Sequence, residues 1–323
     1  MEGKNMSNRA QKVKVAVIQA SSVIMDRDAT TKKAVSLIHQ AAEKGAKIVV
    51  FPEAFIPAYP RGLSFGTTIG SRSAEGRKDW YRYWSNSVAV PDETTEQLGE
   101  AARKAGVYLV IGVTERDNEF SGGTLYCSVL FFDSDGQLLG KHRKLKPTAA
   151  ERIVWGEGDG STLPVFDTPY GRIGALICWE NYMPLARAAM YAQGIQIYIA
   201  PTADARETWQ STIRHIALEG RCFVLSANQY VTKDMYPKDL ACYDELASSP
   251  EIMSRGGSAI VGPLGEYVAE PVFGKEDIII AELDMKQIAY SQFDFDPVGH
   301  YARPDVFKLL VNKEKKTTIE WKN

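Results

Sequence analysis

Apolar runs alternate with amphipathic stretches from the first part of the chain onward. The segment VKVAVIQA at 13–20 is almost wholly apolar and predicts a buried strand. The next stretch, ATTKKAVSLIHQAAEKG, places its apolar residues on one helical stripe before Gly45, and KIVVF supplies a second strand that ends at Phe51. A strand, a helix and a strand in about 40 residues predict a βαβ unit with parallel strands.

The same alternation continues along the chain. Further strands are expected at 107–113, at 124–132 as a hairpin partner, and at the segments RIGALIC, IQIYIA, CFVLSA, GSAIVGP and DIIIAEL. Helices are expected near 93–105, 184–193 and 207–219. Because no linker rich in proline or serine interrupts the pattern, it predicts a single α/β domain. We place this domain at 13–312, after a disordered polar leader at 1–12 and before a short C-terminal tail at 313–323.

Two segments depart from the alternation. Residues 57–87 contain YPRG, several glycines and a cluster of Trp and Tyr, and residues 232–255 are also irregular. Long irregular segments in compact domains are commonly functional loops or interfaces. We therefore expect both segments to shape a site or a contact with another chain.

Composition and charge narrow the class of protein. The 323 residues include 38 basic and 40 acidic ones, a net charge of −2, and 45% are hydrophobic. A chain without a basic excess or a basic block is not expected to bind nucleic acid. No apolar run approaches the roughly 18 residues that span a bilayer, and the first dozen residues lack the apolar core of a signal peptide. These features predict a soluble, cytoplasmic protein.

Cysteine and histidine are scattered along the chain. The four cysteines show neither paired spacing nor the density of a disulfide scaffold, and the four histidines form no ligand pair. We therefore expect free thiols and no metal site.

Three polar residues lie where predicted strands end. Glu53 follows IVVF, Lys144 follows the hairpin at GKHR, and Cys178 closes ALIC. In α/β proteins such strand ends open into the crevice that holds the site. Taken singly, each has an ordinary interpretation: an inert small hydrophobe for the cysteine, a helix cap or solvated charge for the glutamate, and a solvated basic face for the lysine.

Together these residues fit nucleophilic chemistry. A thiol with an ordinary pKa near 8.5 is mostly protonated at neutral pH and needs a base, which Glu53 could supply. Attack on an unsaturated carbon places negative charge on the attached atom. The ammonium of Lys144 and the backbone N–H of Trp179 could stabilise that charge.

Four separated segments resemble a known family. FPEAFIPAYPRG, GKHRKLKPTAAERIVWGEGDGS, ICWENYMPLAR and VGHYARPDV are similar, in this order, to segments of nitrilases in the carbon–nitrogen hydrolase superfamily. The likeness extends from about Val13 to Asn312 and is greatest to the branch that acts on aromatic and arylaliphatic nitriles. The resemblance implies a four-layer αββα sandwich, self-association into dimers and larger spiral or filamentous homo-oligomers, and no cofactor.

The resemblance also implies roles for individual residues. Glu53, Lys144 and Cys178 match the family's Glu-Lys-Cys triad, and Glu151 matches the second carboxylate of the site. The implied reaction converts a nitrile and two waters to a carboxylic acid and ammonia through a thioimidate and a thioester on Cys178, with amide as a by-product.

Other functions remain open at this point. An amidase or carbamoylase would use the same triad, although the Trp after Cys178 favours nitrile chemistry. A catalytically silent, filament-forming protein is an alternative of another class, against which the intact triad and Glu151 speak. A Cys–His hydrolase would need His142 or His215, and the latter falls on a predicted helix.

Substrate contacts are expected from aromatic and polar residues near the triad. We assign these to Tyr59, Trp155, Trp179 and Asn181. An aromatic pocket suits a flat apolar substituent, so aromatic and arylaliphatic nitriles are the expected substrates, with aliphatic nitriles as a further option. The segments around Trp80 and at 230–244 are the expected self-association contacts.

Overall fold

The computed structural model describes residues 10–319. Most of the expected leader at 1–12 therefore lies outside the described residues. Within it, the Ala10 N–H donates to the Pro169 carbonyl at 3.1 Å, and Lys12 already begins the first strand, opposite Asp284. The leader prediction is wrong for these residues because the strand starts one residue earlier than its apolar run.

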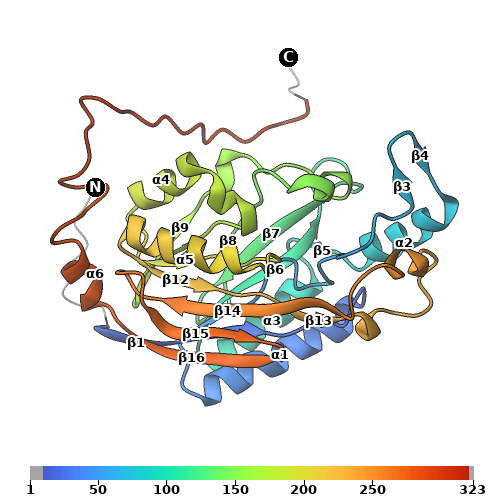
Figure 1. Cartoon of the computed structure of the whole chain (residues 1–323), viewed down its shortest axis with the longest axis horizontal. Coiled ribbons are helices and arrows are strands. Elements are labelled where there is room, and N and C mark those ends of the chain that lie inside the picture. Colours follow the sequence, from blue (N-terminus) through green and yellow to red (C-terminus); the bar gives the residue numbers. More distant parts are fainter. Residues whose placement is uncertain (1–9, 320–323) are drawn as a thin grey trace.

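In the part of the chain that the structure describes, two sheets of seven strands each form the centre (Figure 1). The first sheet has the order β16-β1-β2-β6-β7-β8, with β5 beside β6. Its strands are β1 Lys12–Gln19, β2 Ile48–Val50, β5 Val88–Ala89, β6 Tyr108–Arg116, β7 Leu125–Phe132, β8 Leu138–Arg143 and β16 Asp277–Asp284.

The second sheet has the order β13-β14-β12-β11-β10-β9, with β15 beside β14. Its strands are β9 Val165–Thr168, β10 Gly171–Ala175, β11 Ile197–Ile199, β12 Phe223–Ser226, β13 Tyr230–Thr232, β14 Ile252–Val261 and β15 Tyr267–Phe273. Strands β10, β11 and β12 run parallel to their neighbours in that group, as βαβ crossovers require.

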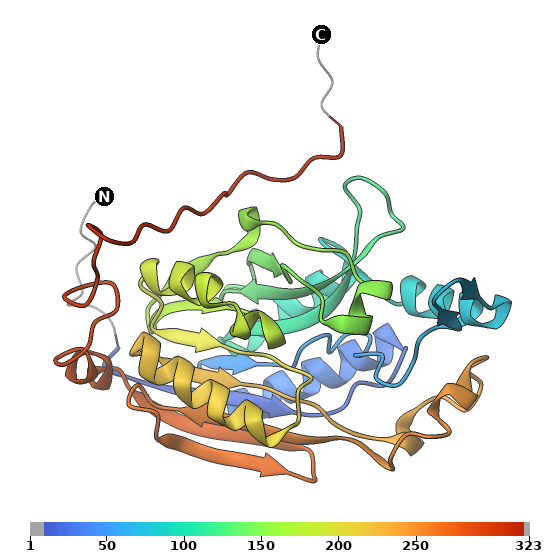
Figure 2. The same ribbon diagram turned by 45° about the horizontal axis from the view of Figure 1, so that its top comes forward.

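Helices cover the outer face of each sheet. Helices α1 Arg27–Glu43 and α3 Glu93–Ala105 pack on the first sheet, and α4 Pro184–Ala192 and α5 Glu207–Gly220 on the second (Figure 2). The βαβ unit is confirmed, since β1 pairs parallel with β2, and the hairpin of β6 and β7 is antiparallel. The predicted αββα sandwich is therefore confirmed.

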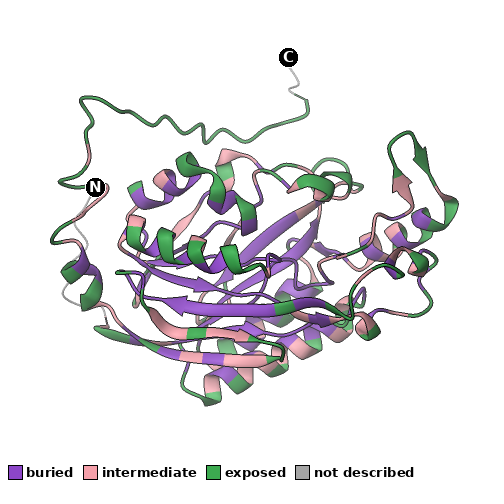
Figure 3. Ribbon diagram, in the orientation of Figure 1, coloured by how far each residue is buried: buried purple, intermediate pink, exposed green. Residues whose placement is uncertain are grey.

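Strand β1 shows why the central strands have continuous apolar sequences. Val13, Val15 and Val17 belong to the core between the two sheets, whereas Ala16 and Ile18 face the core under the helices. Its residues from Val15 to Gln19 are all buried, so both faces of this part of the strand are covered. Figure 3 shows buried residues along much of the central strands. Burying each large apolar side chain contributes roughly 1.5–3 kcal/mol, so no polar face is tolerated.

The two irregular segments contain more structure than their sequences predict. Within 57–87 lie β3 Thr67–Thr68, β4 Ser71–Arg72 and helix α2 Ala74–Ser85, which is capped by Ser73 accepting the Gly76 N–H at 2.9 Å. Helix α2 has few aliphatic residues, so its pattern gave no helical stripe. The 232–255 segment carries the short helices η5 Lys233–Met235 and η6 Tyr243–Leu246 and then the start of β14.

These two segments pack on each other and form one projecting arm. Arg82 pairs with Asp239 at 3.0 Å, and the Asp79 carboxylate accepts the N–H groups of Ala241 at 3.0 Å and Cys242 at 2.7 Å. In Figure 1 the arm, with α2, β3 and β4, extends away from the sandwich.

The C-terminal end follows helix α6 Lys286–Ser291. Residues 292–319 form no helix or strand and run along the outside of the sandwich (Figure 1). No helix within residues 10–319 combines the length and the apolar character that crossing a bilayer requires.

Candidate active site

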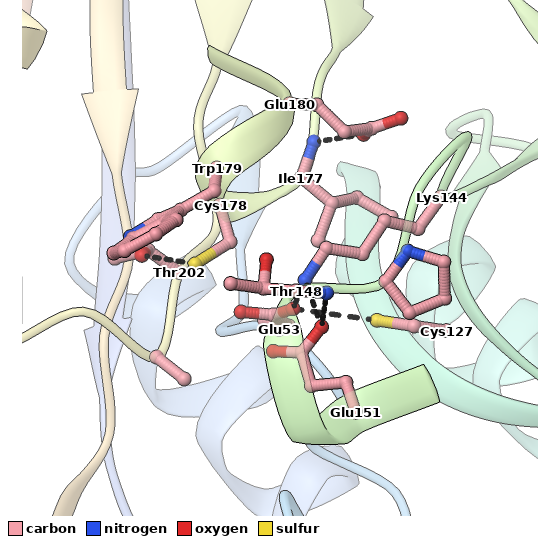
Figure 4. Close-up of polar contacts among 12 residues, drawn as sticks. Glu53, Cys127, Lys144, Thr148, Glu151, Ile177, Cys178, Trp179, Glu180 and Thr202 are labelled. Carbon is pink, nitrogen blue, oxygen red and sulfur yellow. Dashed lines mark hydrogen bonds and ion pairs between the residues drawn. The ribbon is translucent and has the colours of Figure 1, made fainter. Parts of the chain in front are cut away.

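Three strand ends bring the predicted reactive side chains together. Glu53 follows β2, Lys144 follows β8 and Cys178 follows β10, and all three meet in one cluster (Figure 4). Glu151, from the short helix η2 Ala149–Ile153, joins them. The four residues lie together, as their positions at strand ends and in the quoted motifs predict.

The loop that carries Glu53 is held against β6. A Cβ on Gly112 would lie 2.2 Å from the carbonyl oxygen of Pro52, so only glycine allows this approach. The Phe55 N–H donates to the Gly112 carbonyl at 2.8 Å, and the Gln229 side chain, beyond β12, donates to the Glu53 carbonyl at 3.1 Å. The Glu53 loop is therefore fixed by contacts from both sheets.

An ammonium lies between two carboxylates at the centre of the site. Lys144 Nζ donates to Glu53 Oε1 at 2.6 Å and to Glu151 Oε2 at 2.7 Å, with Lys144 and Glu53 fully buried. Burial alone lowers the pKa of Lys144. The neighbouring anions, Glu53 foremost, outweigh burial and raise this pKa well above its ordinary value. The raised pKa favours the charged form of Lys144.

Glu53 has one oxygen available for a proton. Its Oε1 accepts from Lys144 and from the Cys127 thiol at 3.5 Å, while Oε2 is buried without a hydrogen-bond partner among residues 10–319. Burial, with the negative charge of Glu151, raises the pKa of Glu53 despite the opposing effect of Lys144. A buried carboxylate with a free oxygen and a raised pKa is suited to general base catalysis.

Cys178 occupies a strained position at the start of the short helix η4 Cys178–Tyr182. Its φ of 52° lies in the left-handed region, which is uncommon for a residue with a Cβ and clusters at functional sites. Its N–H donates to the Pro201 carbonyl at 2.8 Å. Burial and the charge of Glu53 raise the pKa of the thiol to about 12, so the thiol is protonated at neutral pH and needs a base.

Glu180 fixes the loops of the lysine and the thiol relative to each other. Its buried carboxylate accepts the Ile177 N–H, directly before Cys178, and the Leu145 N–H, directly after Lys144, each at 2.6 Å. It also accepts from His142 Nε2 at 2.9 Å. One carboxylate thus sets the distance between two reactive groups from different sheets.

Neither histidine considered for a Cys–His pair is placed for that role. The second ring nitrogen of His142, Nδ1, faces the Thr162 carbonyl, so both nitrogens are donors. Burial lowers the pKa of His142, but Glu180 outweighs burial and raises it. His215 is largely exposed on α5, 3.8 Å from Glu219. The structure thus gives both histidines other partners.

A cavity of about 550 Å³ opens onto Cys178 and Glu151. Its remaining wall residues are Tyr59, Arg61, Thr148, Trp179, Ala203, Asp204, Ala205, Arg206, Ile252, Met253, Ser254 and Arg255. Tyr59 donates its hydroxyl to Glu151 Oε1 at 2.7 Å, and Trp179 Nε1 donates to Asp204 at 2.9 Å. The wall therefore combines aromatic faces with charged groups.

The four predicted substrate contacts have different positions. Tyr59 and Trp179 line the cavity. Trp155 is buried, edge-on to Tyr59 with ring centroids 5.6 Å apart, and lines an adjacent space of about 180 Å³ together with Glu151.

Asn181 departs from its prediction because it is fully buried and is not on the cavity wall. Its amide donates to the carbonyls of Leu176 at 2.9 Å and Cys178 at 2.8 Å, and its oxygen accepts the Tyr198 hydroxyl at 2.7 Å. The turn of η4 directs this side chain inward, so it anchors the nucleophile loop instead of facing the cavity.

The sequence interpretation missed Thr202 beside the thiol. Thr202 follows β11 and donates its hydroxyl to Cys178 Sγ at 3.1 Å. The rule that located Cys178, a polar residue just beyond an apolar strand, applies equally to IYIAPT. A threonine at such a strand end is a weaker signal than a thiol, because its hydroxyl is not a strong nucleophile without further activation.

Comparisons with known proteins assign the chain to a family. The family profile described as carbon-nitrogen hydrolase matches residues 14–291. The chain therefore belongs to the carbon–nitrogen hydrolase family. An aliphatic nitrilase of Sinorhizobium fredii is 54% identical over 95% of this chain and 98% of its own length. The bifunctional nitrilase/nitrile hydratase NIT4A of Nicotiana tabacum is 53% identical, over 93% and 86% respectively. Within the family, these similarities place the chain with the nitrilases.

Solved structures of the superfamily share the fold. Nit3 of Saccharomyces cerevisiae superposes with a TM-score of 0.71 at 25% identity, covering 92% of this chain and 99% of that one. The NitFhit protein of C. elegans gives a TM-score of 0.73 at 23% identity, covering 96% of this chain and 69% of that one.

Proposed function

We propose that this chain hydrolyses organic nitriles to the carboxylic acid and ammonia, with Glu53, Lys144, Cys178 and Glu151 as its catalytic set. The observation that carries the proposal is the thiol on the cavity wall beside a buried Glu-Lys-Glu cluster. The nitrilases that are about half identical to the chain support nitriles as the substrate class.

In the first half of the reaction, Glu53 accepts the Cys178 proton and the thiolate attacks the nitrile carbon. The sulfur–carbon bond forms as one π pair moves to nitrogen, where Lys144 stabilises the charge. The proton that Glu53 accepted then passes to nitrogen, which completes the thioimidate and leaves Glu53 ionised. The free Oε2 of Glu53 supports its role as the base.

In the second half, water adds to the thioimidate to give a tetrahedral intermediate. If its carbon–nitrogen bond breaks, ammonia leaves and a thioester remains, which a second water activated by Glu53 hydrolyses to the acid. If the carbon–sulfur bond breaks instead, amide is released. Glu151 holds Lys144 and, through Tyr59, one wall of the cavity.

Aromatic and arylaliphatic nitriles are our first choice of substrate, with aliphatic nitriles second. Tyr59, Trp179, Ile252 and Met253 supply apolar area, and a volume of about 550 Å³ lies in the usual range for small-molecule sites. The paired Asp204 and Arg206 at the wall also offer polar contacts.

Ammonia release from phenylacetonitrile, benzonitrile, a short aliphatic nitrile and the matching amides, measured beside Cys178→Ala, tests this proposal. We expect acid and ammonia from nitriles, with none above background from the variant. Release from amides alone would favour the amidase alternative, and silence on all substrates would favour a non-catalytic assembly.

We also infer self-association and a cytoplasmic location. Ile69 and Tyr81 on the projecting arm are exposed apolar residues that suit a contact between copies, in dimers and larger spiral assemblies. All four cysteines are free, as expected in a reducing compartment. Sedimentation of the wild type and Ile69→Asp tests the assembly, since a smaller particle is expected for the variant. Equal particle sizes would contradict the assigned contact.

A further inference from the structure

Thr202 touches the reacting sulfur from the side opposite to the carboxylates (Figure 4). Parallel strands β10 and β11 end side by side, and the Cys178 N–H donates to the Pro201 carbonyl at 2.8 Å. This bond brings the next residue, Thr202, to the thiol, with its Oγ1 3.1 Å from Cys178 Sγ. Thr202 is fully buried, so no solvent competes for its hydroxyl.

The direction of the Thr202 hydroxyl follows from its second contact. The Asp204 N–H lies 2.9 Å from Thr202 Oγ1, and a backbone N–H can only donate. Thr202 Oγ1 therefore accepts at that contact, and its own hydrogen remains for the sulfur. A hydroxyl that receives one hydrogen bond also becomes a better donor in the next, since linked hydrogen bonds polarise one another.

Contacts around Asp204 hold this arrangement in place. Arg206 donates to the Asp204 carboxylate at 2.8 and 2.5 Å, and Trp179 Nε1 donates to it at 2.9 Å. The Asp204 N–H that orients the hydroxyl is thus part of a braced turn, and the same turn holds the residue directly after the nucleophile.

We propose that Thr202 is a further catalytic residue, whose hydroxyl donates a hydrogen bond that stabilises the Cys178 thiolate. When Glu53 removes the thiol proton, the negative charge on sulfur is met by Lys144 and by this O–H. The proposal rests on the proposed function in one part only. If amide forms, thiolate is the leaving group of that step, so the same hydrogen bond also raises the share of amide over acid.

The pKa of the thiol is consistent with this role. Burial and Glu53 raise the pKa of Cys178, whereas Lys144 and the Thr202 hydroxyl lower it. Without Thr202, the buried sulfur loses one of the groups that favour its ionised form.

Alkylation of Cys178 by iodoacetamide tests the proposal without reference to any nitrile. The rate is followed against pH by peptide-resolved mass spectrometry, so that the other three cysteines do not interfere. Thr202→Val keeps the shape and removes the donor, Thr202→Ser keeps the donor, and Thr168→Val is the control, a buried threonine whose hydroxyl bonds the Gly171 carbonyl.

Loss of one hydrogen bond to a charged group is expected to raise the thiol pKa by about one unit. The thiolate fraction then falls about tenfold, and because a more basic thiolate is more nucleophilic, the net alkylation rate falls roughly threefold. We expect this fall, with the profile shifted to higher pH, in Thr202→Val and not in Thr202→Ser or Thr168→Val. If Thr202→Val does not fold, Thr202→Ala takes its place.

Unchanged alkylation in Thr202→Val, or a fall of the same size in Thr202→Ser, would overturn the proposal, because packing and not the donor would then be responsible. On a nitrile from which the wild type releases both products, Thr202→Val should lower the amide share. A higher share would contradict the leaving-group part. If the alkylation rate changes as expected in the Thr202 variants but the wild type hydrolyses no nitrile, the result would count against the proposed function alone.

Discussion

Two consecutive residues at the end of strand β8 belong to two different buried ion clusters. Arg143, the last residue of β8, pairs with Glu115 at 2.6 Å, and Lys144, the next residue, pairs with Glu53 at 2.6 Å. The motif HRK thus supplies cations to two separate clusters. The second cluster adjoins Cys178 (Figure 4).

The clusters differ in how fully the carboxylate is satisfied. Both oxygens of Glu115 accept hydrogen bonds from Arg143, and Lys141 and Ser128 add one each, at 2.5 and 2.7 Å. Glu53 instead keeps Oε2 without a partner among the described residues. A saturated carboxylate stabilises the fold, whereas an unsaturated one remains able to accept a proton.

The pKa shifts follow the same division. Burial raises the pKa of Glu115, but Arg143 and Lys141 outweigh it, and the pKa is lowered. Burial and Glu151 raise the pKa of Glu53 against a single cation. Both carboxylates are buried, so the charges next to them decide whether the pKa falls or rises. Glu115 has two neighbouring cations, whereas Glu53 has one cation and one anion.

The largest difference should appear in activity. Glu53→Gln removes the base and should lower ammonia release from nitriles by roughly 10⁴-fold, as loss of one member of a catalytic unit does. Glu115→Gln should leave kcat of the folded enzyme within about threefold, because Glu115 contacts no residue of the cavity wall among those described. Equal losses in both variants would remove the distinction between the clusters.

The free energy of unfolding should fall by different amounts in the two variants. Glu115→Gln strands buried cations and should cost about 3–5 kcal/mol in denaturant unfolding. A carboxylate whose folded pKa is raised contributes stability only below its unfolded pKa and loses it as pH rises through the folded pKa. Glu53→Gln removes a carboxylate whose raised pKa opposes folding at neutral pH, but it also removes the group that contributes most to the raised pKa of Lys144. Because Glu151 still pairs with Lys144, Glu53→Gln should lower the free energy of unfolding by less than Glu115→Gln does. A larger loss in Glu53→Gln than in Glu115→Gln would contradict this order.

The smallest expected effect is a shift in the pH dependence of kcat/KM. Activity requires ionised Glu53, so the acid limb of kcat/KM should lie above the ordinary carboxylate value of 4.5. Because Glu151 contributes to the raised pKa, Glu151→Gln should move this limb to lower pH in the residual activity. The exposed Glu157, paired with Lys146, offers the control Glu157→Gln. A limb that does not move would mean that another group is titrating.

Sequence patterns located strands and strand ends well because burial on both faces leaves an unambiguous apolar run, and Glu53, Lys144 and Cys178 follow such runs. Sequence patterns did not predict which way a side chain points or which distant segment a helix packs on. The turn at Cys178 rotates Asn181 inward, which spacing cannot reveal. Helix α2 packs on a segment more than 150 positions away, as the pairing of Arg82 with Asp239 shows, and lacks the local stripe that marks helices docked on a sheet.

The Glu180 contacts also have a consequence for the chain while it is being synthesised on the ribosome. The base and the lysine are synthesised before the thiol, and the lysine and thiol loops become fixed to each other only when Glu180 reaches the Leu145 N–H across the two sheets. A nascent chain therefore carries Cys178 without Glu53 and Lys144 held beside it until both halves have docked. Hydrolytic activity is therefore expected only from the completely folded chain.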